Sequence, residues 1–174
     1  MRDYSVREVT GLIKPYGAPS ARMVQFYIEK GMVIATGGGG RGRHRQIPRS
    51  EVPYAALVGH LDGCGFATAD IADIIVALRN LDRYAGGNSL FELVAHDLRL
   101  EMAKPLPKRN PPRLHLFRNL GGELVAARLT GDALVETLVR FPTDKWASEL
   151  IVELDQIVEP LLDIMADGTE TEGD

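Results

Sequence analysis

The side chains that could carry out catalysis or bind a metal are few and scattered in this sequence. They are four histidines and one cysteine, namely His44, His60, Cys64, His96 and His115. None of them has the HExxH or CxxC spacing of zinc sites. A single cysteine cannot form an intrachain disulfide, which is typical of proteins in a reducing cytoplasm. We therefore expect no catalytic residue, no metal, no cofactor and a cytoplasmic location.

The glycine- and arginine-rich segment GGGGRGRHR at residues 37–45 indicates a different chemistry. Its arginines supply positive charge, and its glycines allow the backbone to turn and to approach phosphates closely. A phosphate-binding P-loop is excluded because no GK[ST] follows and no helix begins there. An RGG-like RNA-binding segment would be longer. The segment therefore predicts the tip of a β-hairpin, a wing, that contacts a nucleic-acid backbone.

Charge is distributed unevenly along the 174 residues, whose net charge is −4. Residues 1–50 hold nine Lys and Arg against three acids, residues 51–118 hold eight of each, and residues 119–174 hold three against thirteen. This segregation indicates a module that binds a polyanion, joined to one that does not. Segregation that serves only solubility is the alternative. No apolar run approaches the roughly 20 residues that span a bilayer.

Helix signals place two short helices before the wing. Ser5 with Glu8 three positions later forms a capping-box pattern, and the helix that it opens is broken by KPYGAP at 14–19. Ser20 caps a second helix, which Gly31 ends.

The elements after the second helix follow from the same signals. Short strands at 32–36 and 46–47 are expected to flank the wing. Three further helices are predicted over 52–61, 69–81 and 90–103, the middle one on apolar residues at helical spacing.

The C-terminal part begins after a proline-rich linker at 104–113. Two apolar runs on either side of NLGG predict a β-hairpin over 113–129, and Thr143 opens a predicted last helix over 143–165, which Pro160 kinks. The apolar stripe of that helix is Trp146, Leu150, Leu154, Ile157, Leu161 and Met165. We expect the stripe to form a dimer interface or an effector pocket, and the alternative is a self-contained core for this part of the chain.

The second helix and the residues after it resemble the MerR-like transcription regulators. Members carry a pattern close to T-aliphatic-R-[FY]-Y-E-x-x-G-L, and QFYIEKGMV at 25–33 matches much of it. Phe26 and Tyr27 fit the aromatic pair, Gly31 fits the glycine, and Met32 fits the apolar residue after it.

The resemblance continues into the wing and covers about residues 4–80. GRGRHRQI at 40–47 is similar to the basic wing of the family, and residues 50–78 are similar to its two following helices. The chain departs from the pattern at Gln25, where the family has arginine, and at Ile28, where it has an acid.

A winged helix-turn-helix inserts its second helix into the major groove and needs polar residues near the start of that helix. Arg22 suits guanine and Gln25 suits adenine, while Tyr27 and Lys30 suit the DNA backbone. The predicted DNA contacts are Ser20, Arg22, Gln25, Tyr27, Lys30, Arg41, Arg43, His44 and Arg45.

We therefore predict a mainly α fold in three parts. Residues 1–80 form the MerR-like winged helix-turn-helix, residues 81–112 form a connector helix and linker, and residues 113–174 form a small hairpin with helices and an acidic tail. The resemblance implies a homodimeric transcription regulator that binds a palindromic promoter site in double-stranded DNA and distorts it, with RNA polymerase and an unidentified small-molecule effector as further partners. The alternatives are an architectural or excisionase-like DNA-bending factor, and a regulator that acts mainly through protein contacts of its C-terminal region.

Overall fold

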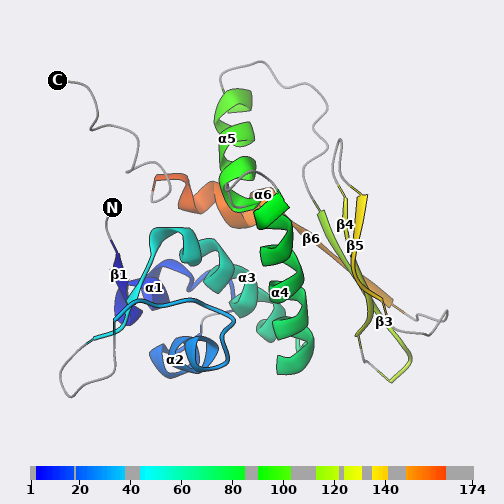
Figure 1. Ribbon diagram of the computed structural model, residues 1–174, viewed down its shortest axis with the longest axis horizontal. Helices are drawn as coiled ribbons and strands as arrows, with labels where there is room; N and C mark the ends of the chain where they lie inside the picture. Colours follow the sequence, from blue (N-terminus) through cyan, green and yellow to red (C-terminus); the bar gives the residue numbers. More distant parts are fainter. Residues whose placement is uncertain are drawn as a thin grey trace. The chain divides into compact units, whose positions relative to one another are not determined.

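The computed structural model describes residues 3–17, 19–37, 44–84, 90–102, 113–121, 124–130, 135–140 and 148–163. Its α-helices within these ranges are α1 Val6–Leu12, α2 Ala21–Glu29, α3 Val52–Gly63, α4 Thr68–Tyr84, α5 Leu90–Met102 and α6 Leu154–Val158 (Figure 1). Helical residues outnumber strand residues, which confirms a mainly α fold. None of the described helices combines the length and the apolar character needed to cross a membrane.

The contacts of the chain group into two compact units. The first holds residues 1–65 with 160–174, and the second holds residues 66–159. The three parts expected from the sequence were defined by the function predicted for each part. That division stays a prediction. The proline-rich linker lies outside the described residues, apart from Arg113.

The first unit begins with two short helices whose caps follow from their sequence. The Ser5 hydroxyl accepts from the Glu8 amide at 3.3 Å, and the Glu8 carboxylate accepts from the Ser5 amide at 2.8 Å. The predicted capping box is thus confirmed. The Ser20 hydroxyl caps α2 by accepting from the Met23 amide at 3.3 Å. Gly31, with φ +72°, follows the helix as expected.

The connection between α1 and α2 lies directly against α3, which is almost entirely buried. A Cβ atom at Gly17 would collide with the carbonyl oxygen of Gly59 and would lie 3.0 Å from its carbonyl carbon. A Cβ atom at Gly59 would lie 2.8 Å from the carbonyl oxygen of Tyr16. Two glycines are therefore required where the loop and the helix meet, since any larger side chain would force their backbones apart.

A buried tyrosine makes a second connection to α3. Tyr27 of α2 is 1% exposed, and its hydroxyl donates to the Asp62 carboxylate at 2.9 Å. Burial and the Asp62 carboxylate both raise the pKa of Tyr27 above its ordinary value, burial more strongly. The position and rotation of α2 are thus fixed by backbone contact at one end and by a side-chain hydrogen bond along its length.

The strand expected at 32–36 was wrong for most of its length. The first two amides of this segment donate to the Tyr27 carbonyl oxygen at 3.0 and 3.3 Å, and the Ile34 amide donates to the carboxylate of Glu51 at 2.8 Å. Glu51 is itself 6% exposed. Because these amides bond to the end of α2 and to a buried carboxylate, they do not donate to a strand partner.

The base of the expected wing is nevertheless closed by hydrogen bonds. Thr36 and Gln46 exchange two backbone bonds of 2.7 and 2.8 Å as an isolated antiparallel bridge. The short strand β2, Gln46–Ile47, pairs with β1, Tyr4–Ser5, which was not expected. Residues 38–43, with Arg41 and Arg43, lie outside the described residues.

The second unit contains a four-stranded antiparallel sheet in the order β5-β4-β3-β6. Its strands are β3 Arg113–Arg118, β4 Leu124–Thr130, β5 Val135–Arg140 and β6 Ser148–Glu153. The predicted hairpin is confirmed as β3 and β4, and the structure extends it by one strand on each side. A small hairpin with helices was therefore too small a description of this part of the chain.

The predicted helix over 143–165 was wrong over residues 148–153, which form β6, and residues 143–147 lie outside the described residues. In register with β3, Leu150 lies opposite Leu116 and Val152 lies opposite Leu114. Both leucines of β3 are fully buried. Pairing of β6 with β3 therefore extends an apolar face of the sheet, and a helix over the same residues would not extend it. The 3-10 turn Glu159–Leu161, with Pro160 inside it, follows α6.

The apolar stripe predicted on that helix is split between different elements. Leu150 lies on β6, whereas Leu154, Ile157 and Leu161 are buried at 0, 3 and 1% exposure. Trp146 and Met165 lie outside the described residues. The dimer interface or effector pocket and the self-contained core both stay predictions for this part of the chain.

We expect Gly17→Ala to lower the free energy of unfolding by about 3 kcal/mol, through a left-handed backbone and overpacking. Gly31→Ala is the matched control, because its φ is also positive but an added Cβ meets nothing within 4 Å. It should cost about 1 kcal/mol. Urea denaturation followed by circular dichroism measures both, and equal losses would contradict the close contact at Gly59.

We expect Tyr27→Phe to lower stability by about 1.5 kcal/mol at neutral pH, since it removes a hydrogen bond to a carboxylate. Because the pKa of Tyr27 is raised in the folded protein, its hydroxyl loses the proton at a lower pH in the unfolded chain than in the folded one. The wild type should therefore lose stability as pH rises above about 10. The variant should lack this component. The free energy of unfolding of both proteins is measured between pH 8 and 11. A difference between the two proteins that stayed constant over this range would contradict the hydrogen bond between Tyr27 and Asp62 as its source.

Candidate nucleic-acid interface

α2 presents a polar face beside its buried one. Val24 and Tyr27 are buried, whereas Arg22, Gln25 and Glu29 are exposed. This division follows from the helical repeat, because residues three and four apart share a face. The exposed face begins next to the capped N-terminus, the end of a helix that favours negatively charged groups.

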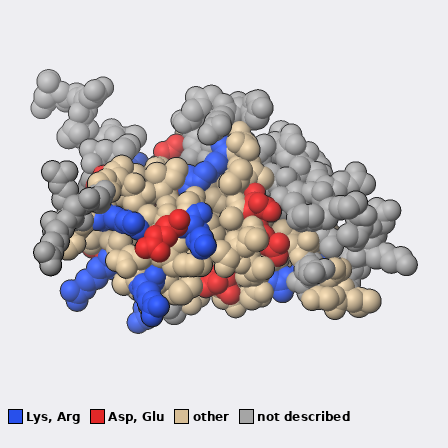
Figure 2. Space-filling model, turned by 60° about the horizontal axis from the view of Figure 1, so that its bottom comes forward, with Lys and Arg blue, Asp and Glu red and all other residues tan. Residues whose placement is uncertain are grey.

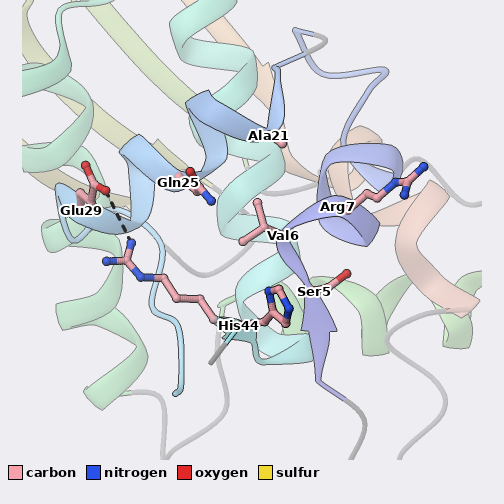
Figure 3. Close-up of a pocket in the computed structure, with 8 residues that line it drawn as sticks. Ser5, Val6, Arg7, Ala21, Gln25, Glu29 and His44 are labelled. Atoms are coloured by element: carbon pink, nitrogen blue, oxygen red, sulfur yellow. Dashed lines mark ion pairs between the residues drawn. The ribbon is translucent and has the colours of Figure 1, made fainter. Parts of the chain in front are cut away.

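A groove of about 440 Å³ runs along this face. It is lined by the start of α1, by α2 and by the residues before β2, namely Ser5, Val6, Arg7, Ala21, Gln25, Glu29, His44 and Arg45 (Figure 3). The antiparallel pairing of Ser5 with Gln46 brings the first and last of these segments together. The groove therefore depends on a strand pair between residues about forty positions apart in the sequence.

The groove holds two arginines and one acid. Arg45 Nη1 lies 3.8 Å from Glu29 Oε1, the pair marked by the dashed line in Figure 3. Their side chains are 39% and 62% exposed, so water screens the attraction and the pair contributes little to stability. Arg7 lies at the opposite end of the groove from Glu29 in this view and is exposed.

The charged side chains on one face of the molecule are not uniformly basic. Figure 2 shows Lys and Arg side chains interspersed with acidic ones over the face that it presents. Such a surface does not attract a polyanion through net charge alone, and the placement of individual cations decides where a phosphate can bind.

The structure places the predicted contact residues at different points. Ser20, Arg22 and Gln25 lie on the exposed face of α2 near its start. His44 and Arg45 join Gln25 in the groove, whereas Arg41 and Arg43 lie outside the described residues. Lys30 is exposed at the end of α2, with its Nζ 5.6 Å from the centre of the Phe26 ring.

Among the described residues, Tyr27 is the predicted contact that the structure places away from the exposed face of α2. Its ring is buried and its hydroxyl is bonded to Asp62, so it anchors α2 instead of facing a ligand. The sequence pattern predicts this residue because it forms an aromatic pair with Phe26. Packing in the core accounts for Tyr27, the buried member of the pair.

Arg7 and Glu29 were missed by the sequence analysis, and Ser5 was recognised only as a cap. Glu29 lies four residues after Gln25, a helical spacing that could have identified it. Nothing local marks Arg7, because its place in the groove depends on the pairing of β1 with β2.

The remaining chemical groups of the described residues form no comparable site. No three His, Cys, Asp or Glu side chains of this part of the chain come together to hold a metal ion. Cys64 Sγ lies 3.8 Å from His60 Nε2, but burial lowers the pKa of His60 and favours its neutral form. Both groups lie at the C-terminal end of α3.

His115 of the second unit connects three strands. Its Nδ1 lies 2.6 Å from the Glu149 carboxylate, and its Nε2 lies 2.9 Å from the Thr130 hydroxyl. Beside it, Arg113 Nε donates to Glu153 at 3.2 Å. These cross-strand bonds hold β6 and β4 on either side of β3.

Comparison with known proteins adds no relative to this picture. No protein-family model matches the chain, and no curated protein matches its sequence. The functional argument therefore depends on α2 and on the groove beside it.

Proposed function

We propose that this protein is a sequence-specific DNA-binding transcription regulator of the MerR-like, winged helix-turn-helix type. The observation that carries the proposal is the exposed polar face of α2 beside a groove that is lined also by the start of α1 and by the residues before β2. In this proposal α2 is the recognition helix, and residues 37–45 are the wing.

The dimensions of α2 suit the major groove. A helix with its side chains is about 10–12 Å across, and the major groove of DNA is about 12 Å wide. Arg22 and Gln25, near its start, have the side chains that form bidentate pairs with guanine and adenine. The buried side of α2 is held by Tyr27 and α3, so the helix is already rigid before DNA binds.

The charges near this helix suit phosphate contacts beside the base contacts. Arg7, Lys14 and Lys30 are exposed in the same unit, and Arg45 lies in the groove. Such contacts position a protein on DNA without reading its sequence.

One helix of this length contacts few base pairs, so a second copy is needed for specificity. We therefore propose a homodimer that binds a palindromic promoter site in the cytoplasm and distorts it, as in MerR-like proteins. A small-molecule effector and RNA polymerase are partners that this function would use.

Arg22→Gln should weaken binding to the preferred DNA at least tenfold and relax the preference at one base pair. Arg113→Gln removes the same charge from the other unit and is the control for charge, and thermal unfolding of this variant is measured as well because it also removes the bond to Glu153. Genomic fragments that the purified protein retains would be sequenced to obtain the site, and fluorescence anisotropy would then measure affinity at several salt concentrations. Retention of DNA without a shared motif would favour an architectural factor, and no retention would overturn the proposal.

The full-length protein should sediment at twice the mass of one chain. It should also bind palindromic DNA with two chains per site, because a two-fold protein matches a two-fold site. Analytical ultracentrifugation of the protein alone and with labelled DNA measures both. One chain bound per palindrome would contradict the dimer.

A further inference from the structure

We propose that Glu29 determines specificity in the groove, by selecting a base that offers an exocyclic amino group, cytosine above all, and by restraining Arg45 from binding phosphate regardless of sequence. This inference rests on the proposed function, because it concerns the DNA bases that α2 faces.

The position of Glu29 places it in line with the base-reading residues. Ala21, Gln25 and Glu29 are spaced four apart on α2, all are exposed, and all line the groove. Four residues of helix advance about 6 Å, and one base pair advances about 3.4 Å. For a helix that lies along the major groove, Glu29 is therefore about two base pairs beyond the base that Gln25 faces.

The chemistry of a carboxylate restricts what Glu29 can face on DNA. An ionised glutamate accepts hydrogen bonds and donates none, so it repels phosphates and the acceptor atoms N7 and O6 of guanine. The amino group of cytosine is the usual partner of an acid in the major groove. Glu29 is the one acidic side chain among the residues that line the groove.

Stability does not explain the acid at this place. Its ion pair with Arg45 is 3.8 Å long and exposed to water, and such pairs contribute little to stability. The pair does have an effect on binding, because the negative charge offsets the positive charge that Arg45 would otherwise offer to any phosphate. Glu29 thereby lowers the affinity for all DNA, and a favourable contact with one base restores affinity for the correct site alone.

The test is Glu29→Gln in the full-length protein, since glutamine has the same shape and prefers adenine. Preference at one base pair should change from cytosine to adenine, by about tenfold in relative affinity. Affinity for unrelated DNA should rise a few-fold, and the slope of log affinity against log salt should steepen by about 0.9, because Arg45 becomes free to neutralise a phosphate. Base preferences would be measured with a library in which each position of the site is varied.

Glu159→Gln is the matched control, because it removes the same charge from an exposed residue that does not line the groove. It should change neither base preference nor salt slope. Thermal unfolding of each variant checks that the fold is kept, which the exposed ion pair leads us to expect.

The outcomes separate this inference from the function on which it rests. Unchanged base preference in Glu29→Gln, with Arg22→Gln still impaired, overturns the inference and leaves DNA binding intact. An equal loss of affinity for every sequence also overturns it, because Glu29 would then only position Arg45. If the wild-type protein retains no DNA, both proposals fail.

Discussion

The candidate site depends first on the backbone contact between Gly17 and Gly59. The connection between α1 and α2 can lie against α3 only because neither residue has a side chain there. This contact, with the hydrogen bond between Tyr27 and Asp62, fixes α2 on one side. The exposed face of α2 makes no contact that the core needs. Arg22, Gln25 and Glu29 can therefore be replaced by other residues without loss of core packing.

Local signals predicted much of the N-terminal unit. Hydroxyl caps at Ser5 and Ser20, and the glycine at the end of α2, act within a few residues, so the sequence shows them directly. The same holds for α3, α4 and α5, whose expected ranges agree closely with the observed ones.

Interactions between distant residues account for what the sequence did not show. The amide of Ile34 bonds to Glu51, the pair β1 with β2 joins residues far apart, and β6 forms because β3 offers it an apolar partner. Residues 148–153 contain leucine, isoleucine and valine at a spacing that fits a helix as well as a strand, so periodicity alone could not decide between them. The groove was missed for the same reason, because two of its three segments meet through β1 and β2.

The arrangement divides the interface into a fixed part and an adjustable part. α2 is held by buried contacts whose loss would cost several times the thermal energy, whereas Arg45 is held by one exposed ion pair that costs little to break. A rigid helix favours discrimination between bases, because a misplaced donor or acceptor cannot move to find another partner. In the proposed function, Glu29 releases Arg45 when its carboxylate contacts a base at the correct site, and Arg45 can then follow the phosphate backbone as the DNA bends. An interface built in this way would combine a fixed sequence requirement with tolerance of DNA shape, which is what a regulator that distorts its site requires.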